Sequence, residues 1–351
     1  MESQIDRLHL LGNLEKLLLA HAPSGSEEEM DRLVMDMVGG AGEAVWRDAA
    51  DSIIVHIRGA SSDAPIAVTA HKDEIAMIVQ RIEEEGRLRM QPVGGLWPWA
   101  VGEGPVEIMG DQELIPGVLS AGSKHTTAGP VAQLKDARAL QWADVWVETK
   151  LDAGTLAEKG VRVGSKAVTA RARKTPWYMG EYICGYNLDC RGGVAILIET
   201  ALQLAQDRPP QDVYLVATSE EEIGAHGAVY SVGQLPAETV IALDVVPVSD
   251  EYQTNNSGNP ILGCKDARGV YNQREVQQLE KLSAELDFDV QTAVLSGYAS
   301  DASIAKSAGA AARSILLGYP GENTHGYEIC AVDGIINSAR LLLAYLQQPV
   351  R

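Results

Sequence analysis

The chain has 351 residues, of which 46% are hydrophobic and 22% charged, a composition typical of globular proteins and unlike that of disordered or collagen-like chains. Acidic residues outnumber basic ones by 48 to 29, which gives a formal net charge of −19 at pH 7. A surface this acidic repels phosphate backbones and anionic lipids, so nucleic acids and membranes are excluded as expected partners. The 4 cysteines form no Cys-x-x-Cys pair, which indicates a reducing compartment and no disulfide scaffold.

The N-terminal segment predicts two helices and no targeting sequence. Apolar residues recur at helical spacing from Ile5 to Leu18, and acidic residues stand where a signal peptide would carry a basic region. A break that begins at Pro23 precedes glutamates suited to the first turn of a second helix. No apolar run approaches the length of about 18 residues that a membrane span needs. We therefore expect a cytoplasmic protein.

The rest of the chain alternates between two patterns. Strand-like runs at 53–58 and 66–70 are followed, over residues 75–180, by short β-type runs between Gly and Pro turns, which predict a small barrel or sandwich. After that, strands alternate with helices, which predicts a mixed or parallel sheet covered on both faces. The predicted strands are 213–218, 240–243, 290–295 and 314–317, and the predicted helices are 192–206, 270–286, 302–308 and 332–346. We expect one α/β domain formed by residues 1–74 and 181–351, interrupted by a β-barrel-like domain at 75–180.

Residue types that bind metal ions follow the predicted strands of the α/β part. They are His71, Asp73, Glu221, Glu222, Asp244 and His325, together with Asp189 just before an apolar helix. Each alone has an ordinary structural explanation, such as a helix N-cap or a solvated face. Because functional groups gather at the carboxyl ends of strands in α/β sheets, we expect these side chains at one edge, where so many acids would repel one another without cations. Two divalent ions held by histidines and carboxylates would neutralise that repulsion.

Short motifs extend this interpretation along almost the whole chain. They are PSGSE at Pro23, AHKDEIA at Ala70, GVLS at Gly117, GVRVGS at Gly160, NLDCRGG at Asn187, EEEIGAHGA at Glu220, ALDVVP at Ala242, SDAS at Ser300 and THGYE at Thr324. In content and order they resemble the dinuclear-metal aminopeptidases of the TET or glutamyl-aminopeptidase family (metallopeptidase family 42), some of whose members are named endoglucanases. The resemblance implies a zinc-peptidase-like sandwich, a mixed central sheet flanked by helices, with an inserted small β-barrel. It also implies dimers that assemble into a tetrahedral dodecamer and remove N-terminal residues from short peptides.

The resemblance also implies a role for each candidate residue. The residues that would hold two metal ions are His71 and Asp244 for one, Glu222 and His325 for the other, and Asp189 for both. Asp73 would orient His71, and Glu221 would be the general base that takes a proton from a water molecule activated by the two ions. Carboxylates with two imidazoles suit Zn²⁺ or Co²⁺, with Mn²⁺ as a further option.

Three residues depart from the family pattern. Cys190 stands where an acid is usual, and we expect it to pack inside the protein. Lys72 follows His71, and we expect it to point to solvent because two cations would repel it. Glu322 lies in the tract before His325, which suggests the hypothesis of a pocket for basic substrate side chains.

Two other functions stay open at this point. A metal-independent glycoside hydrolase needs two carboxyl groups that flank a sugar, and the two histidines among the acids argue against it. A degenerate, non-catalytic metal-binding assembly protein is the other alternative, and the presence of Glu221 argues against it.

Overall fold

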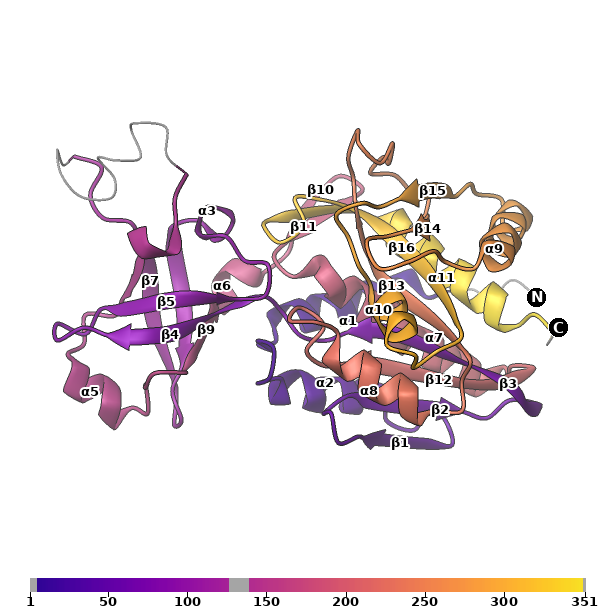
Figure 1. Ribbon diagram of the computed structural model, residues 1–351, viewed down its shortest axis with the longest axis horizontal. Coiled ribbons are helices and arrows are strands. Elements are labelled where there is room, and N and C mark those ends of the chain that lie inside the picture. Colours follow the sequence, from indigo (N-terminus) through magenta and orange to yellow (C-terminus); the bar gives the residue numbers. More distant parts are fainter. Residues whose placement is uncertain (1–4, 126–138, 350–351) are drawn as a thin grey trace.

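The computed structural model describes residues 5–125 and 139–349, which form two bodies side by side (Figure 1). Within those residues, one body is a mixed sheet of eleven strands with helices on both faces, and the other is a closed barrel of six strands. This confirms the predicted fold class of an α/β sheet flanked by helices with an added small β-barrel. The domain limits at residues 75 and 180 stay a prediction.

The large sheet has the strand order β1-β2-β12-β3-β13-β16-β17-β11-β10, and β14 pairs with β15 and β16. Its strands are β1 (Ala44–Arg47), β2 (Ile53–Ile57), β3 (Ser61–His71), β10 (Trp177–Met179), β11 (Tyr182–Gly185), β12 (Gln211–Thr218), β13 (Thr239–Pro247), β14 (Ile261–Lys265), β15 (Gln291–Val294), β16 (Arg313–Glu322) and β17 (Glu328–Ala331). The neighbours β12, β3, β13 and β16 run parallel to one another. Their carboxyl ends therefore meet at one edge of the sheet.

Helices cover both faces of this sheet because its central strands are apolar on both sides. Along β13, Ile241 and Leu243 pack into one core, and Val240 and Ala242 pack into the other. The first core also takes in α1 (Arg7–Leu19), α2 (Glu28–Val38), α7 (Leu188–Gln206), α9 (Gln273–Glu285) and α11 (Val332–Leu346), and the second takes in α8 (His226–Gln234) and α10 (Asp301–Ser307). No helix in the described parts of the chain is both long and apolar enough to cross a membrane.

The barrel has a hydrophobic core of its own, formed by side chains such as Met77, Leu88, Ile108 and Val147. Its strands are β4 (Ala76–Ile82), β5 (Leu88–Val93), β6 (Gly104–Met109), β7 (Leu114–Ser120), β8 (Trp146–Glu148) and β9 (Lys166–Thr169), and its short helices are α3 (Pro98–Val101), η1 (Trp142–Asp144) and α5 (Ala153–Glu158). Helix α6 (Arg171–Lys174) leads the chain back to the large sheet (Figure 1).

A buried ion pair joins the two places where the chain passes between the bodies. Glu74 lies where the chain leaves the sheet, and Lys174 lies where it returns. Lys174 Nζ is 2.7 Å from both carboxylate oxygens of Glu74, and neither side chain is more than 1% exposed. Glu74 also accepts hydrogen bonds from the backbone N–H of Ala22 (2.8 Å) and the side-chain amide of Asn187 (2.6 Å). The pair therefore fixes the two crossings to each other and to the start of α7.

Replacing Lys174 by methionine should destabilise the fold by about 3 kcal/mol or more, because the Glu74 carboxylate stays buried without its nearest cation. The matched control is Lys159→Met, since Lys159 pairs with Glu113 on the surface (2.7 Å) and such pairs contribute about 1 kcal/mol or less. Urea unfolding followed by circular dichroism measures both free energies. Equally small losses in the two variants would contradict the stabilising role of the buried pair.

Candidate metal centre

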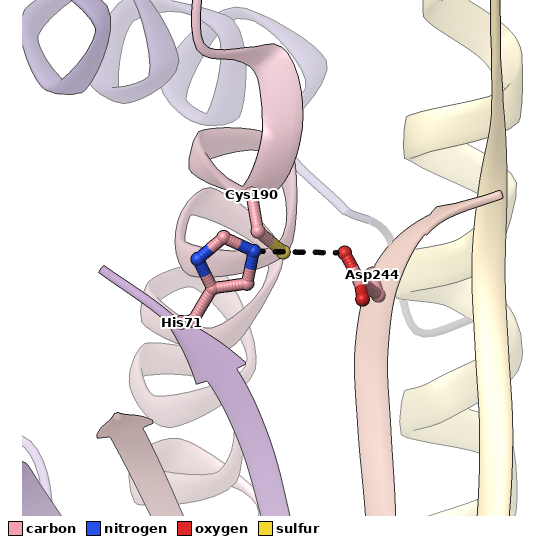
Figure 2. Close-up of side chains that lie close together, drawn as sticks. All are labelled: His71, Cys190 and Asp244. Atoms are coloured by element: carbon pink, nitrogen blue, oxygen red, sulfur yellow. Dashed lines mark ion pairs between the residues drawn. The ribbon is translucent and has the colours of Figure 1, made fainter. Parts of the chain in front are cut away.

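The parallel strands place His71 and Asp244 next to each other at the edge of the sheet. Ala242 of β13 pairs with Thr69 of β3, so Asp244, two residues further along, lies beside His71, the last residue of β3. His71 Nε2 is 3.8 Å from Asp244 Oδ1 (Figure 2). The two side chains are 3% and 8% exposed. The carboxyl ends of two neighbouring parallel strands thus bring these two residues together.

Asp189 lies between the two histidines. Its Oδ1 is 2.9 Å from His71 Nε2, and its Oδ2 is 3.5 Å from His325 Nε2. Glu222 Oε2 is 3.5 Å from the same His325 nitrogen, and Glu221 Oε2 is 4.0 Å from His71 Nε2. All the residues predicted for the site therefore belong to one cluster, with the Asp189 carboxylate at its centre.

Asp73 contacts His71, and it also holds the segment that follows strand β12. Its Oδ1 is 3.4 Å from His71 Nδ1 and accepts a hydrogen bond from the backbone N–H of Glu221 (3.0 Å). Its Oδ2 accepts from the N–H of Glu222 (3.2 Å) and from the Ser24 hydroxyl (2.7 Å). This single carboxylate holds the turn in which two consecutive glutamates both face the cluster.

His325 is positioned by residues far from it in the sequence. Its Nδ1 donates to the carbonyl oxygen of Gly95 (3.0 Å), which leaves the Nε2 lone pair to face Asp189 and Glu222. A Cβ at Gly95 would lie 2.7 Å from that Nδ1, so the close approach requires glycine. Glu328 accepts hydrogen bonds from the backbone N–H groups of His325 (3.2 Å) and Asp189 (3.0 Å).

Four further residues contribute to the site without having been predicted for it: Glu328, Tyr298, Asp301 and Gly95. Glu328 and Asp301 stand inside the quoted motifs. The Tyr298 hydroxyl donates to Asp244 Oδ2 (2.6 Å), and Asp301, which is 3% exposed, accepts from the Thr218 hydroxyl (2.6 Å). The sequence offered one signal for Glu328, which lies three residues after a candidate histidine. For Tyr298 and Gly95 only the folded chain shows the contact.

The cluster carries more negative charge than its histidines balance. Burial, reinforced by repulsion from Asp189, raises the pKa of Asp244 to about 7 and that of Glu328 to about 8. Burial also raises the pKa values of Glu221 and Glu222 well above the usual carboxyl range, and neighbouring carboxylates add to the effect. Near neutral pH these carboxyl groups therefore need either protons or bound cations.

The donor set fits divalent metal ions. Imidazole nitrogen and carboxylate oxygen are ligands of Zn²⁺ and of similar ions. The ligand atoms of His71, Asp189 and Glu222 all lie within 4.8 Å of one another, and so do those of His71, Cys190 and Asp244. A single ion with bonds of about 2.1 Å nearly spans such a separation. Both groups share His71, whose Nε2 is the nitrogen closest to Asp189 in one group and to Asp244 in the other.

The structure corrects one expectation about the residues that depart from the family pattern. Lys72 does not point to solvent: it is 0% exposed, and its Nζ lies 2.5 Å from Glu27 Oε2 and 2.7 Å from Asp31 Oδ1. The Lys72 ammonium group therefore lies between two acidic side chains near the start of α2. Cys190 is buried, as expected, with its Sγ 3.2 Å from the carbonyl oxygen of Leu243.

A cavity adjoins the cluster, between the sheet and the barrel. Its walls combine Asp189, Glu222, His325 and Glu328 with apolar side chains, among them Ile75, Met77, Leu96, Val101 and Ala167. Glu322 is not one of its lining residues, and Glu322 Oε1 accepts a hydrogen bond from the Asn256 amide (3.0 Å). The hypothesis that Glu322 selects basic side chains therefore has no support from the geometry of this cavity.

Comparisons with known proteins agree with the fold and the motifs. A lysyl aminopeptidase of Pyrococcus furiosus is 27% identical over 243 residues, which are 66% of this chain and 65% of the relative. Aminopeptidase APDkam598 from the archaeon Desulfurococcus kamchatkensis has the same fold, with a TM-score of 0.89 and 24% identity over 97% of this chain and 95% of that one. The Pyrococcus horikoshii TET1 peptidase, which can assemble into a tetrahedron or a large octahedral shell, gives a TM-score of 0.85 and 21% identity over 97% and 99% of the two chains.

The family model described as M42 glutamyl aminopeptidase matches residues 51–341, a stretch that includes every residue of the cluster. This match confirms the resemblance that the motifs indicated. On that ground the chain belongs to the M42 glutamyl aminopeptidase family.

Proposed function

We propose that the protein is a dinuclear metal-dependent aminopeptidase that removes N-terminal residues from short peptides. The observation that supports this most directly is the position of Asp189, which directs one oxygen towards His71 and the other towards His325. A carboxylate held in this way can bridge two cations. Membership in the M42 glutamyl aminopeptidase family supports the peptide bond as the target.

In this proposal the metal ligands are His71, Asp189, Glu222, Asp244 and His325. When bound, Zn²⁺ or Co²⁺, or else Mn²⁺, would supply a water molecule of lowered pKa and a polarised peptide carbonyl. Asp73 keeps His71 oriented and holds the turn that carries Glu221 and Glu222. This chain therefore supplies the ligand atoms on strand ends and on turns that are fixed by hydrogen bonds.

Glu221 would move the proton. Its carboxylate lies at the side of the cluster, 4.0 Å from His71 Nε2, and its raised pKa suits a group that accepts a proton and then passes it on. We infer that it takes the proton of the attacking water and delivers it to the leaving amine. Glu222, its neighbour in the sequence, faces His325 and serves as a ligand.

The free α-amine of a peptide would bind among the carboxylates, and its first side chain would enter the adjoining cavity. The apolar walls of that cavity, which include Met77, Leu96 and Val101, favour an apolar side chain over a charged one. The protein would therefore act on peptides with an apolar N-terminal residue.

We also propose that the chain forms a homo-oligomer, in which dimers assemble into a tetrahedral dodecamer. The solved TET1 peptidase structures with this fold support the proposal, since one of them contains a dodecamer. A cytoplasmic location stays a prediction of the sequence.

Replacing Glu221 by glutamine should lower kcat by a factor of about 10² to 10⁴, because the amide keeps the size of the side chain and cannot accept the proton. The metal content of the variant should stay that of the wild-type protein, since Glu221 is not one of the proposed ligands. Chromogenic aminoacyl substrates measure kcat, and elemental analysis measures the bound metal.

The matched control for this variant is Glu220→Gln, the same change one residue earlier. Glu220 lies next to His226, with a carboxylate oxygen 3.2 Å from Nδ1, and belongs to neither candidate metal group. It should retain activity. If Glu221→Gln hydrolysed peptides at the wild-type rate, Glu221 would not be the general base.

Leucyl substrates should be hydrolysed with a kcat/KM about tenfold or more above that of glutamyl substrates, because a second carboxylate in an apolar cavity beside acidic groups is poorly solvated and repelled. Lysyl substrates are the third member of the panel. Since Glu322 does not line the cavity, Glu322→Gln should leave the ratio of lysyl to leucyl turnover unchanged. A preference for glutamyl substrates would contradict the assignment of this cavity to the first side chain.

Removing bound metal with a chelator should abolish peptide hydrolysis, and adding Zn²⁺ or Co²⁺ should restore it. A glycoside hydrolase of the usual type would keep its activity in the presence of the chelator. A non-catalytic assembly protein would show no turnover with or without metal. Activity on glucan but not on peptides would contradict the proposal.

The metal-free protein should also lose thermal stability as the pH rises from about 4 to 8, while metal-loaded protein loses less. The pKa values of Asp244 and Glu328 are raised from 3.8 and 4.5 to about 7 and about 8. The folded state then binds more protons than the unfolded state within this range, so raising the pH disfavours folding. Thermal unfolding of both forms at several pH values measures the difference.

A further inference from the structure

The thiol of Cys190 lies among the atoms of the proposed metal site. Its Sγ belongs to a group with one ligand atom each from His71 and Asp244, and all three atoms lie within 4.8 Å of one another (Figure 2). The three residues are 0%, 2% and 6% exposed. Among the described residues, Cys190 is the one free cysteine placed in such a group; Cys184, Cys264 and Cys330 are not.

The local chain directs this sulfur towards the strand ends. Asp189 and Cys190 lie at the start of α7 and have non-helical backbone angles. The regular helix begins after them. A Cβ at Gly193 would collide with Cys190 Sγ and would lie 3.1 Å from the Leu243 carbonyl oxygen, so the glycine leaves the space that the sulfur occupies. The sulfur is thus held against β13, beside the carboxylate of Asp244.

We propose that Cys190 is a ligand of the metal ion that His71 and Asp244 would hold. This inference rests on the proposed function for the presence of that ion and goes beyond it in the identity of the donor atoms. On binding, the thiol gives up its proton to solvent and the sulfur coordinates the ion as a thiolate. The site then combines nitrogen, oxygen and sulfur donors.

A sulfur donor changes which metal the site prefers. Thiolate is a soft ligand that favours Zn²⁺, whereas sites made of carboxylate and water suit Mn²⁺ and Mg²⁺. The side chain therefore biases this chain towards zinc. Simple packing is the competing explanation, because the Sγ also lies within hydrogen-bonding distance of the Leu243 carbonyl oxygen.

X-ray absorption at the zinc edge of the full-length, zinc-loaded protein separates the two explanations. Coordination by Cys190 predicts a sulfur shell at about 2.3 Å, distinct from nitrogen and oxygen at about 2.0–2.2 Å. The shell should amount to one sulfur for each pair of bound ions. It should vanish in Cys190→Ser and persist in the matched control Cys264→Ser, since Cys264 lies in β14, away from both metal groups.

Competition between metals gives a second readout. In Cys190→Ser, the ratio of Zn²⁺ affinity to Mn²⁺ affinity should fall by about tenfold or more, the scale on which losing a contact in a metal site changes binding. An unchanged ratio would contradict coordination by the thiol.

The wild-type spectrum decides the question even if the serine variant does not fold. Zinc bound by nitrogen and oxygen alone, in protein that hydrolyses peptides, would overturn the role of Cys190 and leave the proposed function in place. Protein that binds no zinc and hydrolyses no peptide would instead overturn the proposed function, and the role of Cys190 with it.

Discussion

The parallel alignment of β3, β12 and β13 is the constraint on which the site depends. It brings three strand ends to one buried edge and so forces carboxylates together in a medium that solvates charge poorly. The fully buried cations Lys72 and Arg191 pair with other acids, Lys72 with Glu27 and Asp31, and Arg191 with Glu74. The negative charge of the cluster is therefore left for protons or metal ions to balance.

The sequence was enough to predict those residues of the site that stand at the ends of strands. His71 and Asp244 follow apolar runs, and parallel neighbours bring such positions together whatever the details of packing. The expectation for Lys72 was wrong. Repulsion by two cations was expected to turn its side chain to solvent, but the sequence does not reveal that Glu27 and Asp31 lie where they pair with it inside the protein.

Contacts between segments that are distant in the chain could not be predicted from the sequence, and the reason is physical. The orientation of His325 depends on the Gly95 carbonyl, 230 residues away, and on Glu328, whose two oxygens hold two separate backbone N–H groups. The Gly95 contact arises only when the barrel packs against the sheet, and the contact of Glu328 with Asp189 arises only when β17 lies beside the start of α7, so neither follows from local propensity. For the same reason the pairing of Lys174 with Glu74 does not follow from the sequence, although the barrel strands themselves were largely predictable.

The barrel is therefore part of the site as well as a separate body. It supplies the carbonyl of Gly95 that orients His325 and the apolar side chains of Met77 and Leu96 that line the cavity. The buried pair of Lys174 and Glu74 holds the two chain crossings together beside the turn that carries Asp189. A rotation of the barrel against the sheet would move both the Gly95 carbonyl that orients His325 and the apolar walls of the cavity. The shape of the cavity and the orientation of His325 therefore depend on the same packing of the barrel against the sheet.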